Sequence, residues 1–138
     1  MRILAVLTSG SAACGVEVEP MECMGAQHFA IGMTVTSTDG RTVTLEAADP
    51  APVDVGENRW TLGITTVDGA PATGLSPMVR PFMPMHGHGL DTTHFAGTEA
   101  ADGSYIIEVF DLIMPGLWEF HVELSDDDVA MFALCAEG

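Results

Sequence analysis

The sequence predicts an all-β fold, a single antiparallel immunoglobulin-like β-sandwich of seven or eight strands. Short extended runs rich in β-branched and aromatic residues follow one another along the chain. Turn signals separate these runs about every 8–12 residues, and no segment after residue 20 has convincing helical periodicity. With 138 residues and 47% hydrophobic content, the chain is long enough for one domain with a genuine core.

The expected strands can be assigned in chain order. They cover residues 29–37, 41–47, 58–67, 76–82, 92–98, 104–110, 117–124 and 129–135. Asp39-Gly40 between the first two is a hairpin signal. The third run alternates apolar with small or polar residues, which is the period of a half-buried strand. Pro77 and Pro81 should confine the fourth run to a sheet edge or an irregular stretch, because proline cannot donate a ladder hydrogen bond.

The N-terminus resembles an export signal. Arg2 is the only charged residue before Glu17, an apolar run follows it, and small residues precede Cys14. Small residues before a cysteine resemble a bacterial lipobox, in which the cysteine is lipidated and becomes the first residue of the mature chain. A plain secretory signal and a cytosolic chain with an accidental apolar start are the alternatives.

This signal sets the expected division of the chain. The expected parts are a lipoprotein-type signal peptide at residues 1–13, a tether at 14–27 and the β-sandwich at 28–138. No other stretch is long enough to span a membrane, so we expect membrane attachment only through the lipid anchor. The expected location is the cell envelope, on its periplasmic or extracellular side.

Two further cysteines, Cys23 and Cys135, stand at opposite ends of the folded region. In an oxidising compartment, an even pair favours a disulfide. Such a bond would tie the first ordered segment to the last, with an expected stabilisation of about 4–5 kcal/mol from chain entropy. The alternative is that the cysteines act as thiolate ligands of a metal.

The charge of the chain limits its partners. The 20 acidic residues face four arginines and no lysine, which gives a formal net charge of −16. Such a surface repels nucleic acid, anionic lipid headgroups and anionic substrates, and it attracts cations. A role in solubility or in a salty habitat explains the charge equally well.

The segment 80–89 has the sequence Arg-Pro-Phe-Met-Pro-Met-His-Gly-His-Gly and is the strongest candidate site. Met83, Met85, His86 and His88 offer thioether and imidazole groups within six positions. No acidic residue lies inside the segment, so nothing in it favours a hard cation. Mixed His/Met sites suit copper, and Cu(I) better than Cu(II). The alternative is a surface loop with solvated histidines and with methionines that fill the end of the core.

Two other residues extend the candidate metal set. His94 is close enough in sequence to complete a three-histidine set with His86 and His88, or it is an exposed strand histidine. Met114 could approach the same loop from a neighbouring strand end, or it fills a gap at the rim of the core. His121 shares its strand face with two glutamates, so we expect it to be solvated.

Enzyme chemistry has little support in the sequence. There is no Gly-x-Ser-x-Gly elbow, phosphate loop or dinucleotide-binding fingerprint. A type-1 copper site is also not expected, because Cys135 has only three residues after it and no histidine or methionine is among them. We therefore expect a protein that is not an enzyme.

Several motifs together resemble the FixH/YtkA-like family of exported β-sandwich domains. They are Gly-Glu-Asn-Arg-Trp at 56–60, Asp-Gly-Ala-Pro at 68–71, Met-Pro-Met-His-Gly-His-Gly at 83–89, Asp-Gly-Ser-Tyr at 102–105, Met-Pro-Gly-Leu-Trp-Glu at 114–119 and Phe-x-x-Cys at 132–135. The resemblance covers roughly residues 28–135. It implies a small, often membrane-tethered or lipidated protein, and some members are linked to copper delivery and to assembly of haem-copper oxidases.

By this resemblance, the family's Met-Pro and histidine stretch would place a metal site at Met83 and His86, with His88 beside it. We expect no transmembrane helix like that of the oxidase-assembly members, and Met85 stands where relatives often have a polar residue. The expected function is an exported, lipid-anchored carrier or buffer of copper that passes the ion to a membrane or periplasmic protein. The alternative is a non-catalytic interaction or assembly module at the cell envelope that binds no metal.

Overall fold

The computed structural model describes residues 23–138 of the chain. The expected signal peptide at 1–13 and the lipidation candidate Cys14 lie outside the described residues, as does most of the expected tether. Between Cys23 and the C-terminus, no helix has the length and apolar character needed to cross a membrane.

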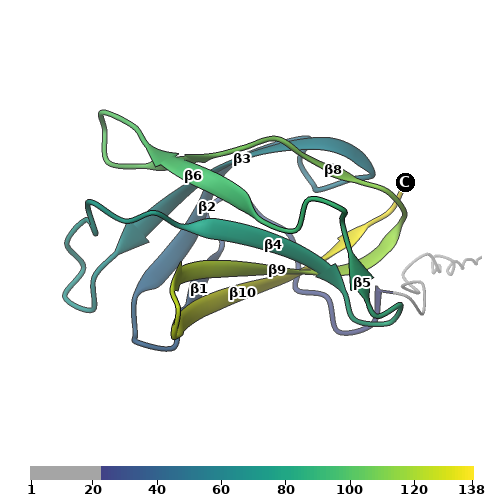
Figure 1. Cartoon of the computed structure of the whole chain (residues 1–138), viewed down its shortest axis with the longest axis horizontal. Coiled ribbons are helices and arrows are strands. Elements are labelled where there is room, and N and C mark those ends of the chain that lie inside the picture. The colour runs from purple at the N-terminus through teal and green to yellow at the C-terminus, as the bar shows by residue number, and fades with distance from the viewer. Residues whose placement is uncertain (1–22) are drawn as a thin grey trace, which may run out of the picture.

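The described residues form ten antiparallel strands, which confirms the all-β expectation (Figure 1). In chain order these are β1 (Thr34–Thr36), β2 (Thr42–Asp49), β3 (Gly56–Thr65), β4 (Met78–Met83), β5 (His88–Gly89), β6 (Phe95–Glu99), β7 (Tyr105–Ile107), β8 (Phe110–Leu112), β9 (Gly116–Ser125) and β10 (Asp128–Ala136). Hydrogen bonds connect them in the order β1-β2-β3-β7-β6-β4-β9-β10, while β5 pairs with β4 and β8 pairs with β3.

The strands make two layers that are joined along one side. In Figure 1, β4, β9 and β10 lie in front of β2 and β3. The strand β6 joins the layers, since it pairs with β7 on one edge and with β4 on the other. The result is a curved sheet that folds onto itself like a sandwich, as expected for this fold class.

The outer edge of β10 is covered by the N-terminal part of the described chain. The amide of Gln27 donates to the carbonyl of Ala133 (2.7 Å), and the Ala133 amide donates to Oε1 of Gln27 (2.8 Å). Further along, the amide of Thr38 donates to the Val129 carbonyl (3.1 Å). Residues 23–27 therefore lie against the sheet, and the last strand does not offer a free edge for pairing with other chains.

Aromatic side chains from both layers fill the core. The ring of Trp60 lies 5.3 Å from that of Phe110, 4.7 Å from Phe120 and 5.9 Å from Phe132, measured between centroids. All four side chains are fully buried or nearly so. Every second residue of β9 and β10 is buried in the same way, as the two-residue period of a β-strand requires.

The structure has more strands than the sequence suggests, partly because a bulge divides the expected strand 104–110. Asn58 pairs with Phe110 and Thr61 pairs with Ile106, so two residues of β3 face three residues of its partner. This extra residue ends β7 and starts β8 in a new register. The short strand β5 also adds to the count, within the segment expected to be a loop.

The expectation that prolines place residues 76–82 at a sheet edge is corrected. The strand β4 lies inside the sheet, with β9 on one side and with β6 and β5 on the other. On that second side, β6 pairs with Met78 and Val79, whereas β5 pairs with Phe82 and Met83. Pro81 falls between the two short partners, where its missing amide hydrogen costs no ladder hydrogen bond.

Candidate functional site

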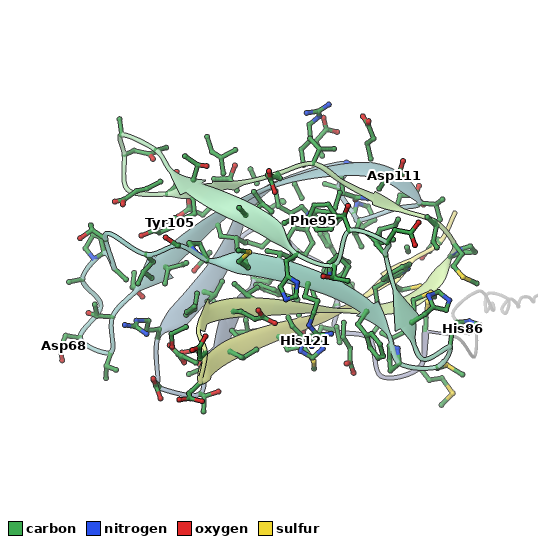
Figure 2. The ribbon with its side chains drawn as sticks, in the orientation of Figure 1. Asp68, His86, Phe95, Tyr105, Asp111 and His121 are labelled. Atoms are coloured by element: carbon green, nitrogen blue, oxygen red, sulfur yellow. A yellow bond between two sulfur atoms is a disulfide. The ribbon has the colours of Figure 1, made fainter. Side chains whose placement is uncertain are left out.

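The His/Met segment forms a tight turn after β4. The carbonyl of Met83 accepts hydrogen bonds from the amides of His86 (3.2 Å) and Gly87 (2.9 Å). Gly87 has φ of +69°, a left-handed conformation that is strained for residues with a Cβ atom. This turn presents His86 at one end of the molecule (Figure 2).

After the turn, β5 runs back along β4. His88 pairs with Met83 and Gly89 pairs with Phe82. At Gly89 the two backbones approach so closely that a Cβ atom would lie 2.7 Å from the carbonyl oxygen of Pro81. Glycine is therefore required at this position, and it holds the turn in its observed register.

The structure brings the imidazole rings of His86 and His88 together. Their centroids are 5.7 Å apart and their planes are inclined by 34°. His86 is exposed and His88 is half-buried. The Nδ1 atom of His88 lies 3.2 Å from the carbonyl oxygen of Gly89. Because a carbonyl oxygen only accepts, Nδ1 carries the hydrogen in this contact, and Nε2 remains as the nitrogen that could bind a metal.

The three candidate methionines have different surroundings. Met85 lies in the turn and is 61% exposed, so its thioether is accessible. Met83 is only 1% exposed, and its side chain belongs to the hydrophobic core. Met114 is half-buried against the core, and its carbonyl accepts a hydrogen bond from Nε1 of Trp118 (3.0 Å).

His94 has carboxylate and hydroxyl partners of its own. Its Nε2 lies 3.2 Å from Oε1 of Glu123, and its Nδ1 lies 2.7 Å from the hydroxyl of Thr93. Glu123 also accepts from Nε of Arg80 at 3.3 Å. The contact with Thr93 can be expected from the sequence, because the two residues are neighbours. The contact with Glu123 cannot, because it depends on the position of β9 in the fold. In this structure His94 is therefore engaged away from the two imidazoles of the turn.

His121 is similar, with Nε2 at 3.1 Å from Oε1 of Glu119 on the same face of β9. Figure 2 shows His121 over the middle of the front layer, whereas His86 lies at its end. Among residues 23–138, no group of three or more His, Cys, Asp or Glu side chains could hold a metal ion. A metal at the turn would thus rely on two imidazoles and on thioether sulfur.

Cys23 and Cys135 are joined in a disulfide with a Cα–Cα distance of 5.3 Å, so their sulfurs are not free thiolate ligands. Cys135 pairs with Leu117 across β9 and β10. On the other side of β9, Phe82 pairs with Glu119, so residues just after β4 lie level with Leu117. The disulfide and the His/Met turn therefore lie at the same end of the sheet.

These features define a small all-β domain with one disulfide and a paired-histidine turn at one end. The chain belongs to the YtkA-like family, whose model matches residues 37–123. The matched range includes the whole His/Met turn and ends within β9, so both Cys23 and Cys135 lie outside it. No curated protein and no solved structure matches the chain.

Proposed function

We propose that this YtkA-like protein is a non-catalytic copper carrier or buffer that holds Cu(I) at the turn between β4 and β5. The ligands are the imidazoles of His86 and His88, with the thioether of Met85 as the accessible third donor. We further propose that the protein is exported and held at the membrane by lipidation of Cys14. The pairing of the two imidazoles carries the proposal.

The spacing of the rings suits a shared ion. Metal–nitrogen bonds of about 2 Å place two ligating nitrogens at most about 4 Å apart. A centroid separation of 5.7 Å is compatible with this spacing, because each nitrogen lies at the edge of its ring, nearer the ion than the centroid. The Gly89 carbonyl orients His88, as outer partners of ligating histidines usually do.

The donor set favours a soft ion. Imidazole and thioether groups suit copper, and Cu(I) in particular, whereas hard cations prefer oxygen ligands. The exposed turn leaves one side of the ion open, so that a ligand of a partner protein can enter before His86 or His88 leaves. Because only neutral imidazole binds a metal, acid should release the ion.

The proposal is tested by anaerobic titration of the purified protein with Cu(I) against a colorimetric Cu(I) chelator. Ascorbate should replace thiol reductants, since thiols bind Cu(I) and would reduce the disulfide. We expect one Cu(I) per chain and at least a hundredfold weaker binding in the His86→Ala/His88→Ala variant. Matched controls are His94→Ala and His121→Ala, which remove imidazoles engaged by carboxylates and should change the affinity less than about threefold.

Equal binding by the double variant and the unchanged protein would contradict the site. Failure of the protein to compete with the chelator would contradict the function itself. Either result would favour the interaction module without a metal, in which the prolines and methionines of the turn contact a partner protein. In that case substitution of Phe82, which pairs with Gly89, should impair function more than substitution of the histidines.

A further inference from the structure

The sheet is open at the end that carries the His/Met turn. Within the described residues, β8 pairs only with β3, and β5 pairs only with β4. Residues 90–94 run between these two strands without joining either of them. Figure 1 shows β5 and the end of β8 at the same end of the molecule, in different layers.

A hollow of about 300 Å³ lies between residues 90–95 and 109–113. We call this hollow the seam. Its apolar wall is formed by Leu90, Phe95, Val109 and Ile113, and its rim carries the carboxylates of Asp91 and Asp111. Ile113 is 61% exposed, although a side chain of this size is normally buried in a domain of this kind. Figure 2 shows Asp111 directed away from the core, at the end that also carries His86.

We propose that the seam binds an extended segment of a partner protein that presents apolar and cationic side chains on one face, because Val109, Asp111 and Ile113 all lie on the outward face of β8 and its flanks. The segment would lie along the free edge of β8, place apolar side chains against Val109 and Ile113, and place cationic side chains near Asp91 and Asp111. We further propose that this partner is the protein that exchanges copper with the His/Met turn, and this part of the proposal rests on the proposed function.

The backbone supports an extended ligand. A strand with one unpaired edge is a template for a further strand, and peptide recognition by strand addition uses main-chain hydrogen bonds for affinity. The opposite outer edge of the sheet, at β10, is covered by Gln27 and Thr38. The edge beside the seam has no such cover among residues 23–138, so it remains available to a second chain.

Charge supports a cationic ligand. The described part of the chain has three arginines, and each pairs with an acidic residue of the same molecule: Arg41 with Asp128, Arg59 with Glu57 and Arg80 with Glu123. None of them lines the seam. With two carboxylates at the rim and a net charge of −16, the complementary cations must come from the partner.

The position of the seam links docking to metal exchange. Leu90 follows directly after β5, the strand that carries His88. A segment seated against Leu90 would therefore hold its protein close to the paired imidazoles. Ligand exchange needs such proximity, because it converts a bimolecular step into one within a complex.

The test is an NMR titration of the metal-free protein with a synthetic peptide of the repeat Val-Thr-Lys-Thr, which places valine and lysine on the same face of an extended strand. A second peptide carries glutamate in place of lysine. We expect the lysine peptide to shift the amide signals of residues 90–94 and 109–113, and the glutamate peptide to leave them unchanged. Equal shifts with both peptides, or shifts centred on other surfaces, would overturn the proposal.

One substitution separates docking from unspecific charge attraction. Ile113→Asp adds a carboxylate, so unspecific attraction of a cationic peptide would persist or increase. Docking through the apolar wall should instead become at least tenfold weaker. The matched control is Val67→Asp, which makes the same kind of change at a 73% exposed site beside Asp68, at the opposite end of the molecule (Figure 2). Unchanged binding of the lysine peptide by Ile113→Asp would overturn the proposal that the seam is the docking site.

The copper titration distinguishes the two proposals. Ile113→Asp should bind Cu(I) like the unchanged protein, because Ile113 belongs to the seam and not to the ligand set. If copper binding is intact and the lysine peptide does not bind at the seam, only the docking proposal fails. If the peptide binds at the seam and Cu(I) does not bind, the seam is a protein-binding site and the copper function fails.

Discussion

The two ends of the sandwich are held by different means. At the end away from the His/Met turn, the turn between β1 and β2 contacts the start of β10 through Asp128. This carboxylate is fully buried, and it accepts from the amide of Asp39 (2.8 Å) and from Nη1 of Arg41 (2.6 Å). At the His/Met end, a disulfide holds the chain while the turn, the edge of β8 and the seam remain accessible.

The lowered pKa of Asp128 shows that its partners stabilise the buried carboxylate. Burial alone would raise the pKa of this carboxyl group. The hydrogen bonds from the Asp39 amide and from Ser37, together with the Arg41 guanidinium, outweigh burial and hold the pKa below its usual value. The folded state thus favours the charged form of Asp128, because the hydrogen-bond donors around the carboxylate compensate for its burial.

The difference between the ends indicates a division of roles. At one end, the polar groups around Asp128 are hydrogen-bonded to one another, so few of them remain to bind a ligand. At the other end, His86 and Met85 are exposed, and a covalent bond makes a large packed interface less necessary for stability. The buried polar network and the accessible donor groups therefore lie at opposite ends of one small sheet.

The largest expected effect comes from removing the disulfide. The variant Cys23→Ser/Cys135→Ser should lose about 2–5 kcal/mol of the free energy of unfolding, because the bond closes a loop between residues 112 positions apart. Denaturant unfolding of the oxidised protein and the variant measures the difference. Copper affinity should persist wherever the variant remains folded, since neither sulfur belongs to the proposed ligand set. Loss of copper affinity in the folded variant would show that the disulfide shapes the turn.

A smaller loss is expected at the closed end. Asp128→Asn keeps an oxygen for the Asp39 amide but removes the charge that pairs with Arg41. Hydrogen bonds to charged groups contribute about 1.5–3 kcal/mol, and we expect a loss of this size in the free energy of unfolding. The matched control is Asp127→Asn, which removes the same charge from an exposed neighbour and should have little effect. Equal losses in both variants would contradict the closed network.

The pH dependence of this difference follows from the lowered pKa. The unfolded carboxyl group titrates near its reference pKa of about 3.9, and the folded group titrates below that value. The stabilisation by Asp128 is therefore fully present above about pH 4 and is lost as the pH falls through the folded pKa. The difference in unfolding free energy between the unchanged protein and Asp128→Asn should shrink over the same acidic range.

The smallest expected effect on stability lies in the His/Met turn. In Gly89→Ala, the added methyl group meets the Pro81 carbonyl, a backbone atom that cannot rotate away. We expect a loss of about 1–2 kcal/mol of unfolding free energy, as for other overpacked sites, together with weaker Cu(I) binding. His88→Ala, one residue away, should weaken Cu(I) binding without this loss of stability. Unchanged copper affinity in Gly89→Ala would show that β5 does not position the imidazoles.

Much of the fold can be predicted from local sequence. Alternation of apolar with small or polar residues predicts β3, and Asp39-Gly40 predicts the turn before β2. The division of residues 104–110 cannot be predicted in this way, because the bulge depends on the register against β3. The place of β4 inside the sheet also escapes prediction, since Pro81 is tolerated only because two short strands share that edge.

The candidate site also has features that the sequence predicts and features that it does not. The donors and the glycines of the turn stand together in the sequence, and the structure brings His86 and His88 together as this proximity suggests. The placement of Met83 in the core depends on the inward face of β4, and the contact of His94 depends on β9. Neither can be judged from spacing within residues 83–94.

The sequence by itself determined the all-β class, the YtkA-like resemblance, the acidic surface and the concentration of soft donors in one short segment. These properties depend on composition and on neighbours within a few positions. Only the tertiary structure decided which donors remain accessible, that Cys23 meets Cys135, that Asp128 closes one end and that the seam stays open at the other. Each of these depends on contacts between strands that are distant in the chain, and such contacts are set by register and packing rather than by local propensity.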